Sequence, residues 1–183
     1  MAFEVEVKAH VDDPRALQVI IESIGGITPP TPIDKEDWYF ARPGERALFR
    51  LRREAAQMVF TRKHKGIADG IETNEEFEFT APSDQGDAAA AFFLSLGYEI
   101  VAKKNKRGLS YSLFFNDTLG DVNLELCEVS PLGWFIEVEF VLSERSLVEE
   151  ARRALIEVLA LLTIPDSQVE ARPYLDLLSQ STG

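Results

Sequence analysis

The stretch Phe3-Glu4-Val5-Glu6-Val7-Lys8 carries the pattern that decides the fold. Side chains alternate between two faces along a β-strand, so Glu4, Glu6 and Lys8 share one face and the apolar residues share the other. Two carboxylates and an ammonium group in a row make an unusual face for a single strand. The interpretation therefore depends on whether other strands repeat this alternation.

Short segments of strand-like sequence, separated by turn residues, predict an antiparallel sheet. They span residues 35–40, 47–54, 57–65, 72–81, 99–106, 109–116, 121–129 and 134–142. Helices are expected from a cap at Asp13 to Gly25, over residues 87–96, from a cap at Ser143 to Leu162, and over residues 173–178. We expect one domain over residues 1–179 and a frayed tail at residues 180–183.

Charged side chains gather on one face of seven predicted strands. The acids are Glu4, Glu6, Glu76, Glu78, Glu125, Glu137 and Glu139, and the bases are Lys8, Arg50, Arg52, Lys63, Lys65, Lys104 and Lys106. An antiparallel sheet with one wet face would also show this alternation. However, the helices have apolar faces that must cover the apolar side of the sheet, and seven or eight strands can close on themselves. The sequence therefore predicts an α+β fold, a closed antiparallel β-tunnel with a charged lumen and helices outside.

The balance of acids and bases suits a polyanion that carries divalent cations. Arginine and lysine bind phosphoryl oxygens, and carboxylates bind Mg²⁺ or Mn²⁺. Glu4 and Glu6 are two residues apart, about 7 Å along a strand, and Glu137 and Glu139 repeat this spacing. Phosphoryl and nucleotidyl transfer depend mainly on positioning and charge neutralisation, which such a lumen can supply.

The overall composition excludes several other classes of protein. A net charge of −12 over 183 residues argues against a general nucleic-acid-binding protein, although a local basic pocket is compatible with it. The single cysteine, Cys127, cannot form an internal disulfide and favours a reducing compartment. The sequence has neither a signal peptide nor a long apolar run, so a soluble cytoplasmic protein without membrane partners is expected.

Several segments carry a resemblance to a known family. They are Glu4-Val5-Glu6-Val7-Lys8, Asp37-Trp38-Tyr39-Phe40, Leu48-Phe49-Arg50-Leu51-Arg52, Thr61-Arg62-Lys63, Leu132-Gly133-Trp134-Phe135-Ile136-Glu137-Val138-Glu139 and Arg172-Pro173-Tyr174-Leu175-Asp176-Leu177-Leu178. In order, they resemble the ExExK, D-x-Y-F, LR-x-R, T-x-K, LG-x-F-x-E-x-E and S-Y-x-x-L-L motifs of the CYTH superfamily, the triphosphate tunnel metalloenzymes. The resemblance implies an eight-stranded antiparallel tunnel that binds a triphosphate inside.

The resemblance also implies roles for individual residues. It makes Glu4, Glu6 and Lys8 catalytic, and it makes Glu4, Glu6, Glu137 and Glu139 metal ligands. Phosphate-binding residues would be Lys8, Arg50, Arg52, Lys63, Lys65, Lys104, Lys106 and Arg107. Tyr39, Glu76 and Glu78 would complete the tunnel lining. Independently of the resemblance, Tyr174 is expected to anchor the last helix.

The sequence departs from the family pattern at three places. Asn74 stands where the family has an arginine, and Lys65 could partly replace it. Cys127 stands where an acid is usual, and Glu125, on the same face, is the candidate metal ligand in its place. The basic pair after the second helix reads either as Lys104 with Lys106 or as Lys106 with Arg107, which a bulge near Gly108 would reconcile.

Three functions follow from the resemblance, all with an organic triphosphate as the small-molecule partner and Mg²⁺ or Mn²⁺ as cofactor. The favoured reading is a class IV-type adenylyl cyclase that converts ATP to cyclic AMP and pyrophosphate. The alternatives are a triphosphatase, acting on thiamine triphosphate, a nucleotide or tripolyphosphate, and a tunnel that binds without turnover. A homodimer is compatible with the resemblance.

Overall fold

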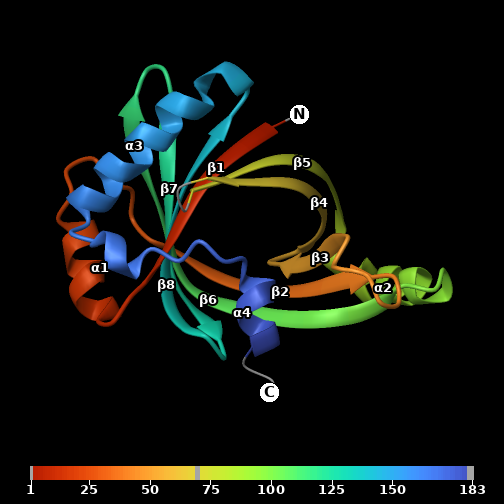
Figure 1. Ribbon diagram of the computed structural model, residues 1–183. Helices are drawn as coiled ribbons and strands as arrows, with labels where there is room; N and C mark the ends of the chain where they lie inside the picture. The colour runs from red at the N-terminus through yellow and green to blue at the C-terminus, as the bar shows by residue number, and fades with distance from the viewer. Residues whose placement is uncertain (1, 69–70, 181–183) are drawn as a thin grey trace.

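The computed structural model describes residues 2–68 and 71–180, and side chains over residues 3–63 and 71–179. Within these residues, eight antiparallel strands close into a barrel in the order β1-β5-β4-β3-β2-β6-β7-β8 (Figure 1). The strands are β1 (Ala2–His10), β2 (Thr31–Ala41), β3 (Phe49–Glu54), β4 (Gln57–Ala68), β5 (Ile71–Pro82), β6 (Glu99–Asn116), β7 (Gly120–Ser130) and β8 (Gly133–Leu142). The closed antiparallel barrel with outer helices confirms the predicted fold.

The helices lie around the barrel on different sides. They are α1 (Pro14–Glu22), α2 (Gly86–Ser95), α3 (Val148–Leu161) and α4 (Tyr174–Gln180). In Figure 1, α1 and α3 lie together on one side, whereas α2 lies on the opposite side of the barrel. Among the described residues, no helix is long and apolar enough to cross a lipid bilayer. The predicted tail at residues 180–183 lies outside the described residues, except for Gln180.

The start of α1 confirms the sequence expectation, but the start of α3 does not. The Asp13 carboxylate accepts hydrogen bonds from the backbone N–H groups of Arg15 and Ala16, at 3.1 and 3.0 Å. This satisfies N–H groups that the first turn of a helix leaves without partners. Ser143 does not cap α3, because a short 3₁₀ turn over Arg145–Leu147 precedes the helix and moves its start to Val148.

The structure corrects the prediction of two strands over residues 99–106 and 109–116. Residues Glu99–Asn116 form the single strand β6, which pairs continuously with β7 through Gly108. A Cβ at Gly108 would lie 2.1 Å from the Leu126 carbonyl oxygen, so only glycine allows the two backbones to approach this closely. The glycine therefore keeps β6 continuous, and no bulge occurs in the β6–β7 pairing at this point.

The strand register places the predicted charged face inside the barrel. Glu6 pairs with Glu139 across β1 and β8, and Lys63 pairs with Glu76 across β4 and β5. Because paired residues share a face, the polar residues of neighbouring strands project to the same side all around the barrel.

The apolar outer face of the barrel packs against the helices in two separate clusters. The larger cluster buries Val5 and Val138 of the sheet against Leu17 of α1 and Leu155 of α3. The second cluster joins residues of β2, β3 and β4 to Ala90 and Phe93 of α2, including Phe40, Leu51 and Phe60. These clusters bury the helices' apolar faces, which is the main source of their stability.

A third apolar cluster differs because it lies on the inner side of the strands. It contains Cys127, Val129 and Phe135, whose register places them on the same face as the charged residues, together with Tyr174 and Leu177 of α4. Cys127 is fully buried there, and burial raises the pKa of its thiol to about 12. The helix α4 therefore packs onto lumen-facing side chains rather than onto the outer face.

Candidate active site

The lumen contains a cavity of about 990 Å³, at the upper end of the usual range for small-molecule sites. Each of the eight strands contributes at least one charged side chain to its lining. One such residue from each strand, in chain order, is Glu4, Lys35, Arg50, Lys63, Glu72, Lys104, Glu125 and Glu137. The cavity wall therefore depends on closure of the whole barrel.

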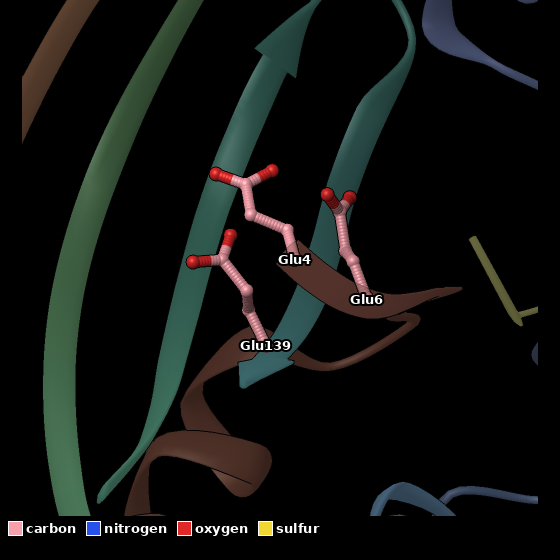
Figure 2. Close-up of side chains that lie close together, drawn as sticks. All are labelled: Glu4, Glu6 and Glu139. Carbon is pink, nitrogen blue, oxygen red and sulfur yellow. The ribbon is translucent and has the colours of Figure 1, made fainter. Parts of the chain in front are cut away.

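Three carboxyl groups cluster on one side of this cavity. Glu4 and Glu6 come from β1 and Glu139 comes from β8, and one oxygen of each lies within 4.8 Å of the others. In Figure 2 the three side chains point to the same side of their strands. The Glu6–Glu139 pairing in the register explains this proximity. Three converging carboxylate oxygens are a donor set that suits a hard divalent cation.

The electrostatics of this carboxylate cluster disfavour three negative charges in the absence of a cation. Burial raises the pKa of Glu4, Glu6 and Glu139. For Glu139, the neighbouring carboxylates of Glu4 and Glu6 raise the pKa further. Because like charges in a desolvated site repel, a bound cation would relieve this cost.

The other two predicted metal ligands, Glu125 and Glu137, do not join the carboxylate cluster. Lys106 forms ion pairs with both carboxylates, and Lys35 donates to Glu125 at 2.7 Å. Burial opposes ionisation of Glu137, but Lys106 and Lys104 outweigh it and lower the pKa of this carboxyl group. The two acids therefore serve as counter-charges to lysines.

A basic wall, formed by Arg50, Arg52 and Lys104, surrounds the buried side chain of Asp37. Arg52 donates through Nε and Nη2 to the two Asp37 oxygens, at 2.6 and 3.0 Å, and Lys104 Nζ lies 3.1 Å from Oδ2. Burial raises the pKa of Asp37, yet Lys104 and the two arginines hold it well below its usual range. Asp37 is therefore an ionised partner at the centre of this wall.

Three more predicted lumen residues have defined partners. Lys63 bonds to Glu4 at 2.6 Å and forms an ion pair with Glu76, and so borders the carboxylate cluster. Lys8 is buried, 3.6 Å from Glu72 and 5.4 Å from the centre of the Tyr174 ring. Glu78 accepts a hydrogen bond from the Thr61 hydroxyl at 3.0 Å.

Two predicted phosphate-binding residues, Arg107 and Lys65, are not found among the described side chains of the cavity wall. Arg107 does not line the lumen, because the uninterrupted alternation of β6 turns it outward, where it pairs with exposed Asp34 at 3.2 Å. The structure therefore places Lys104 and Lys106, and not Arg107, in the cavity. Lys65 lies in β4 opposite Asn74, but its side chain is outside the described residues.

Sequence reasoning missed several residues of the site, including Glu72, which lines the cavity from β5. Lys35 and Asp37 share a face of β2 with Tyr39, so the two-residue period starting from Tyr39 would have found both. Tyr174 was expected only to anchor the last helix. Its hydroxyl donates a hydrogen bond to Glu137 at 2.5 Å, and Lys104 Nζ lies 4.4 Å from the centre of its ring. No local pattern indicates that contact, since it depends on how α4 packs.

Solved structures share this fold. The PH1819 protein from Pyrococcus horikoshii OT3 is 24% identical with a TM-score of 0.76, over 97% of this chain and 99% of that one. A protein provisionally assigned as an adenylate cyclase, from Vibrio parahaemolyticus, is 18% identical with a TM-score of 0.75, over 97% and 98%. A Hippeastrum protein, provisionally assigned as an adenylyl cyclase but reported to have a dominant triphosphatase activity, is 16% identical with a TM-score of 0.68, over 94% and 91%.

The sequence comparisons give the family directly. No curated protein matches the chain significantly. The family model for the CYTH domain matches residues 2–174, nearly the whole chain. Its match includes the strands that carry the carboxylate cluster and the basic wall. The chain therefore belongs to the CYTH domain family.

Proposed function

We propose that the protein is a divalent-metal-dependent enzyme that cleaves a phosphorus–oxygen bond of an organic triphosphate. The observation that supports this function is the division of one cavity into a carboxylate cluster and a basic wall. A triphosphate with its cation needs both, because the cation binds carboxylate oxygens and the phosphoryl oxygens bind cationic side chains.

The residues present fit Mg²⁺ or Mn²⁺. Glu4, Glu6 and Glu139 would hold the ion, and their raised pKa values are consistent with a site that favours a cation. A bound divalent ion would neutralise charge that develops on phosphoryl oxygens during the reaction. Small hard cations in such sites usually keep several waters and share ligands with the substrate phosphates.

The basic side chains would bind and orient the phosphates. Arg50, Lys63 and Lys104 line the same cavity as the carboxylate cluster. Lys8 and Lys106 are buried and line it as well, so their charges act in a poorly screened environment. Positioning by such groups supplies most of the catalysis in phosphoryl transfer.

The first candidate reaction is that of an adenylyl cyclase. The ribose 3′-oxygen of ATP would attack the α-phosphorus, the bond from that phosphorus to the bridging oxygen would break, and pyrophosphate would leave. The proton of the hydroxyl would pass to a base or to water. The resemblance of the Leu132–Glu139 segment and of Tyr174-Leu175-Asp176-Leu177-Leu178 to cyclase motifs supports this reaction.

The second candidate reaction is hydrolysis, in which water attacks the terminal phosphorus, the bond from that phosphorus to the bridging oxygen breaks, and orthophosphate and the diphosphate are released. Asn74 is fully buried beside Glu4 in the register, and its Oδ1 has no hydrogen-bond partner among the described residues. A buried unpaired carbonyl oxygen is costly and is often satisfied by water, which hydrolysis requires. The triphosphatase activity reported for the Hippeastrum protein supports the same candidate.

One assay separates these reactions from binding alone. The purified protein is incubated with ATP, thiamine triphosphate or tripolyphosphate, with Mg²⁺, Mn²⁺ or a chelator, and the products are resolved by chromatography. Cyclic AMP with pyrophosphate identifies a cyclase, whereas ADP, thiamine diphosphate or orthophosphate identifies a triphosphatase. Binding without any product would refute an enzymatic function, and a reaction that persists in chelator would refute metal dependence.

A further inference from the structure

Asp37 is the only acid among the described residues that contacts all three cations of the basic wall. Its side chain is fully buried on β2, between β3, which carries Arg50 and Arg52, and β6, which carries Lys104. It binds Arg52 through two hydrogen bonds and lies 3.1 Å from Lys104 and 4.0 Å from Arg50. The Tyr39 hydroxyl adds a fourth contact at 3.3 Å.

These contacts give the two arginines different capacities for a ligand. Arg52 donates hydrogen bonds to Asp37 through Nε and Nη2. This edge of the guanidinium would otherwise be able to bind a phosphoryl group through two parallel hydrogen bonds. Arg50 donates through Nη2 to the Thr61 hydroxyl at 3.1 Å, and its buried Nε has no partner among the described residues. Arg50 therefore keeps its Nε edge for an anion, whereas the Nε edge of Arg52 is already occupied by Asp37 and only its remaining N–H groups can reach a ligand.

The charge of Asp37 has two opposite effects on this wall. Three cations held together in a buried site repel one another, so an anion between them stabilises the empty cavity. The same fixed anion repels a phosphate that approaches those cations. An ordinary structural ion pair would have only the first effect, and this difference can be measured.

We propose that Asp37 is a positioning residue that acts as an internal counter-anion for the triphosphate site. It holds Arg52 and Lys104 in place before a ligand arrives, and it limits how tightly the basic wall retains a polyphosphate product. This proposal rests on the proposed function, because it assumes that the basic wall binds phosphate. It concerns a residue that acts through its neighbours and does not itself contact the reacting atoms.

The test compares the wild-type protein with Asp37→Asn. Inorganic tripolyphosphate is titrated calorimetrically in a chelating buffer, so that binding reports the charge of the wall without turnover. Removal of a nearby negative charge should tighten binding about tenfold. In the metal-supplemented assay, the variant should have a lower KM and also a lower kcat, because product leaves slowly and Arg52 loses its orientation.

A matched control uses the same strand and the same change of charge. Glu36 lies on the outer face of β2, where it accepts a hydrogen bond from the Trp38 indole at 2.9 Å. Glu36→Gln should leave the affinity for tripolyphosphate unchanged. If Glu36→Gln tightens binding as much as Asp37→Asn, the effect is one of net charge and the proposal is wrong.

A second variant covers the case in which Asp37→Asn does not fold. Asp37→Asn combined with Lys104→Gln removes one anion and one cation, so it should recover the thermal stability that the single variant loses. Tripolyphosphate should also stabilise Asp37→Asn by a larger shift in Tm than wild type. If neither the second substitution nor the ligand restores folding, Asp37 is a structural residue only.

The remaining outcomes separate this proposal from the proposed function. If the wild-type protein does not bind tripolyphosphate, both the proposed function and the counter-anion role of Asp37 are wrong. A wild-type protein that binds, with an Asp37→Asn variant of equal or weaker affinity, would overturn the counter-anion role and leave the proposed function in place.

Discussion

The hydroxyl of Tyr174 donates to the carboxylate of Glu137 at 2.5 Å, which ties the last helix to the inner face of the barrel. The Tyr174 ring also packs against Phe135, with the ring centres 5.1 Å apart. Burial raises the pKa of this phenol, and the negative charge of Glu137 raises it further. The hydroxyl therefore stays protonated and able to donate.

Tyr174→Phe should remove this hydrogen bond and keep the ring. Because the acceptor is a buried charged group, we expect the free energy of unfolding to fall by about 1–2 kcal/mol, measured by urea denaturation. Tyr98→Phe is the matched control, since the Tyr98 hydroxyl has no hydrogen bond among the described residues. Tyr98 packs against Phe49 through its ring alone. Equal losses in both variants would contradict the importance of the Glu137 contact.

Glu4→Gln or Glu6→Gln should lower metal-dependent turnover by about 100-fold while the fold stays intact. Each variant removes one negative ligand from the carboxylate cluster, so the midpoint of Mn²⁺ activation should also rise. Turnover and circular dichroism are measured together. Glu128→Gln, an exposed acid on the outer face of β7, is the control. Full activity in either lumen variant would remove that residue from the metal site.

Acid should weaken Mn²⁺ binding, because protons compete with the cation for carboxyl groups of raised pKa. We expect affinity to fall more than about tenfold between about pH 7.5 and about pH 5.5. In the metal-free protein, by contrast, acid should increase the stability of the fold. A carboxyl group whose pKa is raised in the folded state stabilises the folded protein below its unfolded pKa of about 4.3, and this contribution is lost as pH rises through the folded-state pKa.

Calorimetric titration at several pH values checks the metal affinity, and thermal unfolding in chelator checks the stability. Glu139→Gln should flatten both pH dependences, since it removes the carboxyl group whose pKa is raised by both neighbours. A Mn²⁺ affinity that does not change with pH would exclude this cluster as the metal ligands.

The two arginines of the basic wall should differ when each is replaced by alanine. Arg52→Ala removes the two hydrogen bonds that Arg52 donates to the buried Asp37 carboxylate. We therefore expect a loss of about 3 kcal/mol in unfolding free energy as well as weaker tripolyphosphate binding. Arg50→Ala should weaken binding about tenfold with a much smaller loss of stability, because Arg50 donates a hydrogen bond to the neutral Thr61 hydroxyl and lies 4.0 Å from Asp37. Identical behaviour of the two variants would contradict their separate assignments.

Gly108→Ala should destabilise the protein by about 3 kcal/mol, because the added Cβ would collide with the Leu126 carbonyl oxygen. Gly25→Ala is the control, since a Cβ at Gly25 would have no atom within 4 Å. Urea denaturation of both variants measures the difference. Wild-type stability in Gly108→Ala would mean that β6 and β7 can move apart without cost.

The alternation of charge was enough to predict the lumen, because a two-residue period is a local property of each strand. Glu4, Glu6 and Lys63 all face inward as this period requires. The continuity of β6 was not predicted. In sequence, Gly108 resembles an interruption, and the reason for a glycine appears only where β6 passes close to β7.

The grouping of acids could not be predicted from sequence, because it depends on the stagger between strands. Glu137 and Glu139 look equivalent in the chain, yet Glu139 lies opposite Glu6 whereas Glu137 lies opposite Lys8 and binds Lys106. Asp37 is different, since its position two residues before Tyr39 would have been enough to predict that it faces inward, although it was not among the predicted lumen residues. Its central place in the basic wall still required the neighbouring strands.

The two sides of the site rest on different hydrophobic cores. The strands of the carboxylate cluster, β1 and β8, are packed by α1 and α3, whereas β2 and β3, which carry Asp37 and the two arginines, are packed by α2 (Figure 1). Substitutions that accumulate beneath α2 can therefore change the basic wall without disturbing the carboxylate cluster. Under the proposed function, natural selection could in this way change substrate preference and retain the chemistry.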